Sequence, residues 1–114
     1  MRPPQEKSCS QQLADWIVAA RFEDIPPDVV AATRHRVLDV IGLALTGATT
    51  AFGKSVRAST VELHAGGPSR LLATGERVAM PAAAFANGAF SQALEFDDTH
   101  NESIVHMSSP SVSA

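Results

Sequence analysis

The chain has 114 residues, a length that fits about one small domain. Its formal net charge is −3, and lysine and arginine are scattered, so the sequence has no basic cluster of the kind that binds nucleic acid. Cys9 is the only cysteine, which excludes an intrachain disulfide, and no apolar segment reaches the length of a membrane span. The sequence therefore predicts a cytoplasmic protein that binds neither nucleic acid nor membrane.

Two helices are predicted in the first part of the chain, after a disordered tail over residues 1–9. The first covers residues 11–20, with Ser10 as its N-cap. Its apolar residues recur with helical spacing: Leu13, Trp16, Ile17 and Ala20. The second covers residues 27–46, because Pro26 and Pro27 fit a first helical turn, where proline loses no needed hydrogen bond.

The second predicted helix is apolar nearly all round over "VLDVIGLALTG" and ends at Gly47. Such a helix is expected to be buried on most sides or to face a partner chain. Asp39 lies inside this run, and a buried carboxylate needs polar partners, so we expect it to cap or bond to a neighbouring element.

A third helix over 52–65, a short β-hairpin near 70–79 and a fourth helix over 81–95 complete an all-α, bundle-like fold. The residues expected to face inward on the third helix are Val56, Ser59, Thr60 and Leu63. "RLLAT" and "RVAM", separated by Gly-Glu, predict the two strands. The fourth helix is rich in small residues, and Gly88 predicts a close backbone contact. Asn87 is either a packed polar group or a ligand contact.

A dense polar segment follows the fourth predicted helix. Its titratable and polar residues are Glu95, Asp97, Asp98, Thr99, His100, Asn101, Glu102 and His106. Three interpretations stay open on residue types alone. The segment is a solvated, capped loop, a site of acid/base chemistry that uses histidine beside carboxylates, or a metal site of a hydrolase. The metal site would use Asp97, Asp98, His100 and His106, although their spacing matches no known metal motif.

Two longer stretches, taken in order, resemble the MmgE/PrpD family. They are "LADWIVAARFEDIPPDVVAATRHRVLDVIGLALTGA" and "RLLATGERVAMPAAAFANGAFSQALEFDDTHNESIVH". The resemblance implies a helical domain paired with a smaller α/β lid domain, in a homodimer when full length. It implies that residues 10–114 are the N-terminal part of the helical domain and that the lid is absent. It also implies acid/base chemistry on small di- or tricarboxylates such as 2-methylcitrate or cis-aconitate, with no cofactor and no metal.

The resemblance assigns roles in the polar segment. His106 matches an active-site histidine and is the expected general acid/base, and Thr99 matches a threonine of the substrate pocket. Glu95 stands where the family often has aspartate and is a third catalytic candidate. The residues of the segment expected to bind substrate or orient the histidines are Asp97, Asp98 and His100. Asn87, on the fourth predicted helix, is a further candidate for substrate binding on its residue type and not on the resemblance.

The sequence departs from the family pattern after His106, where Met107-Ser108 replaces the usual proline followed by glycine or serine. The acidic segment also has no lysine or arginine beside it, and an acidic pocket without a cation repels a polycarboxylate. The leading prediction is a dehydratase or decarboxylase of which the chain alone is inactive. The alternatives are an epimerase of the same family and a non-catalytic helical protein that associates with a partner.

Overall fold

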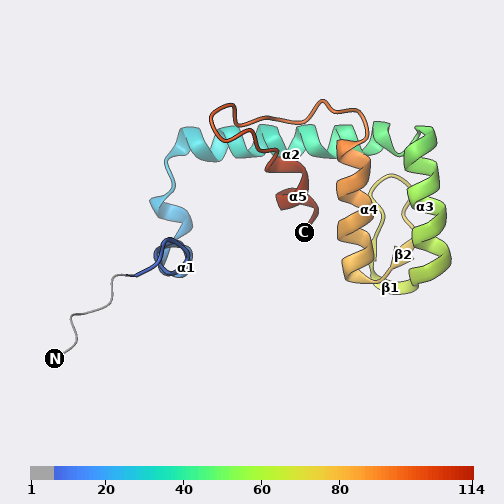
Figure 1. Cartoon of the computed structure of the whole chain (residues 1–114), viewed down its shortest axis with the longest axis horizontal. Coiled ribbons are helices and arrows are strands. Elements are labelled where there is room, and N and C mark those ends of the chain that lie inside the picture. The colour runs from blue at the N-terminus through green and yellow to red at the C-terminus, as the bar shows by residue number, and fades with distance from the viewer. Residues whose placement is uncertain (1–6) are drawn as a thin grey trace. The chain divides into compact units, whose positions relative to one another are not determined.

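The computed structural model describes residues 7–114 (Figure 1). Its elements in chain order are α1 (Cys9–Ala19), the 3-10 turn η1 (Phe22–Asp24), α2 (Pro27–Gly47), α3 (Ala51–His64), β1 (Ala65–Arg70), β2 (Arg77–Val78), α4 (Met80–Gln92) and α5 (Ser108–Ser113). The mostly helical fold with one short hairpin is confirmed. The chain divides into two compact units, residues 1–31 and 32–114, each of which is described by itself.

Helix α1 in the first unit begins two residues earlier than the sequence predicts. The side-chain oxygen of Ser8 accepts from the backbone N–H of Gln11, and the Gln11 side chain accepts from the backbone N–H of Ser8. Ser10 cannot form such a capping box, because the residue three positions later is Leu13, whose side chain has no hydrogen-bond acceptor. Ser10 is therefore not the N-cap, and Cys9 belongs to the helix. Residues 1–6 of the predicted tail lie outside the described residues.

Helix α2 starts and ends where the sequence predicts, but only one face of it is covered. The buried residues Val40, Ala44 and Gly47 follow helical spacing along one stripe. Leu38 is 69% exposed on another face. Asp39 is exposed as well, so the expectation of a buried, paired carboxylate is wrong for this structure. No single helix within residues 7–114 is long and apolar enough to cross a membrane, and α2 with α3, bent by 89°, reaches that length and composition only as a pair.

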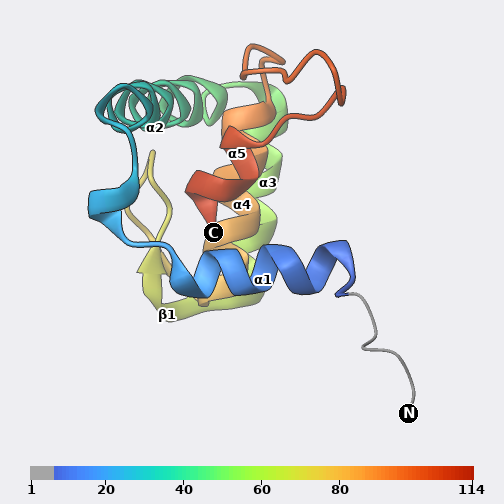
Figure 2. The ribbon, with the colours of Figure 1, turned by 90° about the vertical axis from the view of Figure 1, so that its left-hand side faces the viewer.

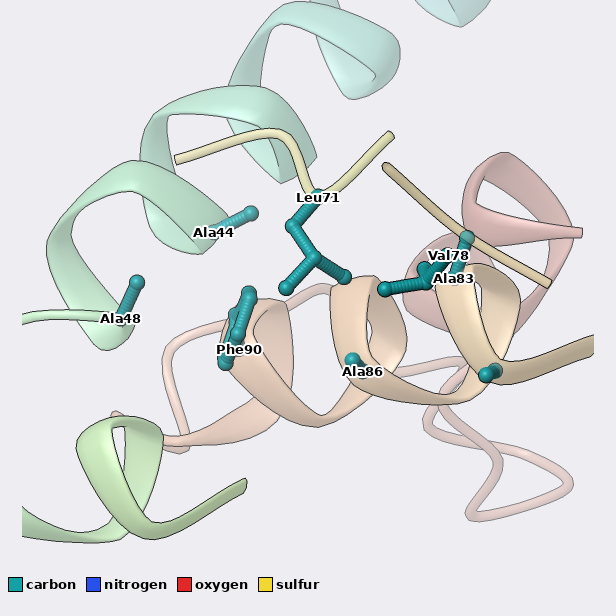
Figure 3. Close-up of a cluster of buried hydrophobic side chains, with 8 residues drawn as sticks. Ala44, Ala48, Leu71, Val78, Ala83, Ala86 and Phe90 are labelled. Atoms are coloured by element: carbon teal, nitrogen blue, oxygen red, sulfur yellow. The ribbon is translucent and has the colours of Figure 1, made fainter. Parts of the chain in front are cut away.

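The second unit packs α3 and α4 side by side, with the hairpin against both (Figures 1 and 2). Leu71, from the hairpin turn, points into a cluster of mostly small side chains that includes Val78 and Phe90 (Figure 3). Thr60 on α3 is buried and Val56 is partly buried, as predicted. Ser59 and Leu63 are exposed, so their predicted inward positions are wrong. The small alanine side chains of α4 leave space in this cluster, and the larger side chains of Leu71 and Phe90 fill it.

The hairpin exists, but its first strand lies earlier than predicted. β1 pairs antiparallel with β2, with Arg70 opposite Arg77. Most of "RLLAT" forms the turn, in which the N–H of Gly75 donates to the carbonyl of Leu71 at 2.8 Å. Residues 65–70 hold two glycines and a proline, a composition that disfavours strands. The strand register is irregular between Ala65 and Ser69, and Gly67 is needed there because a Cβ would overlap the carbonyl of Val78.

A close approach between helices occurs at Gly47 rather than at Gly88. A Cβ at Gly47 would overlap the carbonyl oxygen of Phe90 on α4. A Cβ at Gly88 would lie 3.7 Å from the side chain of Ser113 on α5, which is an ordinary contact distance. The prediction of an unusually close contact at Gly88 is therefore wrong, although that position does face another helix.

We expect the stability of the second unit to depend on Glu76 in the hairpin turn. Hydrogen bonds from the side chains of Thr74 and Arg57 hold the pKa of Glu76 below its ordinary value of 4.5. A carboxylate whose pKa is lowered by folding stabilises the protein above its unfolded pKa, and that stabilisation disappears as the pH falls through the folded pKa. Glu76→Gln should therefore lower the melting temperature at neutral pH, with a difference from wild type that closes in acid. Thermal unfolding of both proteins from neutral to acid pH measures the two melting temperatures. An equal difference between them at every pH would contradict the stabilising role of the Glu76 carboxylate.

Candidate functional site

The predicted site residues lie mainly on the segment between α4 and α5, residues 95–107, which we call the site loop. Helix α4 ends where the N–H of Ala93 turns back to the carbonyl of Phe90. The site loop then runs back along α2, where Arg36 lies 3.7 Å from Asp98 (Figure 1). It leads into α5, which packs against α4. Both ends of the site loop are thus held by the same helix.

Asp97, Thr99 and His106 come together in the site loop. The side chain of Asp97 is fully buried, and its Oδ1 lies 3.3 Å from Nδ1 of His106. The Oγ1 of Thr99 lies 3.4 Å from the same ring nitrogen. The imidazole itself is 43% exposed. The arrangement pairs a buried carboxylate with a histidine that solvent and small molecules can reach.

Nδ1 of His106 is within ion-pair distance of Oδ1 of Asp97, but the two groups are not oriented so as to form a hydrogen bond. Oδ1 of Asp97 is buried and has no aligned donor, whereas Oδ2 accepts from the hydroxyl of Ser109 at 3.1 Å. A buried carboxylate oxygen without a donor costs free energy. Catalytic hydrogen bonds are often long or poorly aligned before substrate binds, so this contact is compatible with a catalytic pair.

His100 forms its hydrogen bonds within the site loop. Its Nδ1 lies 2.7 Å from the hydroxyl of Ser103 and accepts from the N–H of that residue at 3.3 Å. Its backbone forms an isolated antiparallel bridge with Val105. These contacts shape the site loop, and the predicted contact of His100 with substrate stays a prediction.

Arg36 is a residue that the sequence analysis missed. It lies on α2, and its Nε approaches Oδ2 of Asp98, with the Arg36 side chain 57% exposed. The acidic segment therefore does have a cation beside it, contrary to the expectation from local sequence. No local pattern could have found Arg36, because the two residues are far apart in the chain and meet only when the site loop folds back over α2.

Glu95 is not brought to His106. Within residues 7–114, no hydrogen bond or ion pair joins the two side chains. Glu95 has a φ of 54°, in the left-handed region that few residues other than glycine adopt. It lies beside a separate hollow of about 370 Å³ with Phe52 and Gln92. The catalytic role of Glu95 stays a prediction that these contacts do not support.

Asn87 ties α4 to the hairpin. Its Oδ1 accepts from the N–H of Leu72 at 2.9 Å, and its Nδ2 donates to the carbonyl of Arg70 at 3.1 Å. The side chain is buried, so both bonds satisfy groups that water cannot reach. This is the packing role that the sequence left open, and a substrate contact gains no support from it.

The metal interpretation requires at least three ligands that converge. Among the residues that the structure describes, no group of three or more His, Cys, Asp or Glu side chains is placed to hold a metal ion. Asp97 and His106 lie together, but His100 bonds inside the loop and Asp98 pairs with Arg36, so two of the four proposed ligands have other partners. The described residues therefore do not assemble a set of three metal ligands by themselves.

Comparisons with known proteins find relatives that match most of this chain. The family profile of the MmgE/PrpD N-terminal domain matches residues 11–114. Cis-aconitate decarboxylase of Aspergillus terreus is 31% identical over 100 residues, which are 88% of this chain and 20% of that protein. The cis-aconitate decarboxylase-like protein oryM of Aspergillus oryzae is 29% identical over 104 residues, 91% of this chain and 22% of that protein.

The chain thus spans about a fifth of the length of the curated relatives it matches. No solved structure matches it. The match to the N-terminal domain runs from α1 to the last residue and includes the whole site loop. The chain therefore belongs to the MmgE/PrpD family.

Proposed function

We propose that the chain supplies the acid/base residues of a lyase active site. The lyase is a dehydratase or decarboxylase that acts on a small di- or tricarboxylate such as 2-methylcitrate or cis-aconitate. The reaction proceeds without a metal. The full-length enzyme is a cytoplasmic homodimer in this proposal. The observation that carries it is the pairing of the exposed His106 imidazole with the buried carboxylate of Asp97.

The chemistry of such a lyase needs a group that moves a proton at a carbon next to a carboxylate. Histidine suits this work near neutral pH, because its two protonation states are close in free energy. His106 takes or gives that proton, and the hydroxyl of Thr99, beside the same ring, contacts the substrate. Arg36 adds a positive charge at the other side of the site loop, which offsets the charge of Asp98 and lowers the repulsion of an anionic substrate.

A second candidate function is association without catalysis. It is favoured by large apolar side chains that are exposed on the helices and the site loop. Among them, Leu38 is 69%, Phe85 70% and Phe96 79% exposed. Surfaces of this kind mark contacts with another protein or with further parts of the same protein. An epimerase of the same family would use the same histidine, so only the products of the reaction separate it from a lyase.

A chimera tests the lyase proposal. Residues 11–114 replace the matching segment of the Aspergillus terreus cis-aconitate decarboxylase, and the product is assayed with a panel of di- and tricarboxylates in the presence of a chelator. We expect turnover with release of carbon dioxide or water. A folded chimera that binds its partner segments but turns over none of these acids would favour association without catalysis, and activity that the chelator abolishes would contradict the metal-free mechanism.

A further inference from the structure

Ser109, in the first turn of α5, is a buried serine outside the set of candidate site residues. It is 2% exposed, and its hydroxyl donates to Oδ2 of Asp97 at 3.1 Å. Helix α5 itself is held against α4, where Gly88 faces Ser113. The backbone that carries Ser109 is therefore held by the packing of α5 on α4.

The bond from Ser109 leaves the two oxygens of Asp97 in different situations. Oδ2 has its donor, whereas Oδ1 is buried and has no aligned hydrogen-bond donor. Nδ1 of His106, which carries a hydrogen in one of the two neutral tautomers, lies 3.3 Å from Oδ1. An imidazole with a bare Nδ1 would place a lone pair against a buried carboxylate oxygen, which is unfavourable.

We propose that Ser109 is a positioning residue that acts on His106 through Asp97. The Ser109 hydroxyl orients the carboxylate, and Oδ1 of the carboxylate keeps the proton of the neutral imidazole on Nδ1. The hydrogen bond that one ring nitrogen makes determines which nitrogen is protonated. Nε2 of His106 is then the unprotonated atom, available to take a proton from a substrate. The purpose of this arrangement rests on the proposed function, but the position of the proton does not.

The test is the tautomer of His106, read from the nitrogen chemical shifts of its ring in ¹⁵N-labelled protein at a pH where the imidazole is neutral. The chain has four histidines, and the spectrum of His106→Gln identifies the signals of His106. In the wild type we expect the proton on Nδ1. In Ser109→Ala we expect the ratio of the Nδ1–H to the Nε2–H tautomer to fall about threefold or more, the effect of weakening one hydrogen bond.

Two further variants separate positioning from structure. Ser109→Cys retains the shape of the side chain with a weaker donor and should give an intermediate ratio. Ser111→Ala lies on the exposed side of the same helix and should leave the ratio unchanged. Thermal unfolding of each variant checks that the fold is retained, and Ser109→Cys replaces Ser109→Ala if the latter does not fold.

A wild-type protein with the proton on Nε2 would overturn the proposal without any variant. An unchanged ratio in a folded Ser109 variant would overturn it as well. The measurement uses no substrate, so its outcome is independent of the lyase assay. A proton on Nδ1 together with an inactive chimera would mean that the positioning holds and the proposed function fails.

Discussion

Replacing His106 with alanine is expected to lower kcat by about 100-fold or more in a chimera that turns over a carboxylate. The reason is that a positioned general acid/base contributes roughly this factor or more to a proton transfer. His106 is the reachable imidazole of the site loop with a buried carboxylate behind it, so its removal leaves Asp97 without the group that moves the proton. Steady-state kinetics with the best substrate of the panel measure the effect.

The matched control removes a different imidazole. His64 lies in the last turn of α3, is exposed and lies outside the site loop, so His64→Ala should leave kcat within a few-fold of the unchanged chimera. The separate effects of His106→Ala on kcat and on KM also test its role. A loss in kcat with an unaltered KM fits a group that acts on the reacting atoms, whereas an unaltered kcat in His106→Ala would remove His106 from the proposed mechanism.

Gly47→Ala is expected to reduce the free energy of unfolding by about 2 kcal/mol. The added Cβ overlaps the backbone carbonyl oxygen of Phe90, and no rotamer change can separate them because the position of a Cβ is fixed by its own backbone. Helices α2 and α4 would have to move apart at this contact, which also loosens the packing of Phe90 in the core. Denaturant unfolding followed by circular dichroism gives the change.

Gly42→Ala is the matched control on the same helix. A Cβ at Gly42 meets no atom within 4 Å, and alanine has the higher helix propensity, so this variant should gain up to about 1 kcal/mol. The two substitutions are chemically identical and differ only in what the new methyl group meets. Equal losses in both variants would mean that the contact with Phe90 does not limit the approach of the helices.

Local signals in the sequence predicted the helices well. Pro27 at a first turn located the start of α2, and Gly47 marked its end. The prediction of β1 was wrong because two glycines and a proline carry little strand propensity, and pairing with β2 overrides that weakness. The expected burial of Asp39 was wrong because an apolar run predicts that a helix is covered without predicting which part of a protein covers it.

The candidate site was predictable only where its residues are neighbours in the chain. The spacing of Thr99 and His106 placed them on one loop, and the structure brings both to the same ring nitrogen. The sequence predicted no role for Ser109, because nothing in its local pattern distinguishes it from the other serines of its segment. Arg36 was missed for a different reason: it reaches the loop by tertiary contact with Asp98.

The backbone bridge between His100 and Val105 separates the site loop into two parts that differ in how well they tolerate a change in length. The N–H of His100 donates to the carbonyl of Val105 at 2.9 Å, so the backbone closes into a ring before the chain reaches His106. Residues 101–104 lie inside this ring and are exposed. An insertion or deletion there alters the size of the ring while Thr99 and His106, which flank it, keep their places. Length variation among relatives at this point is therefore compatible with an unchanged pair of site residues.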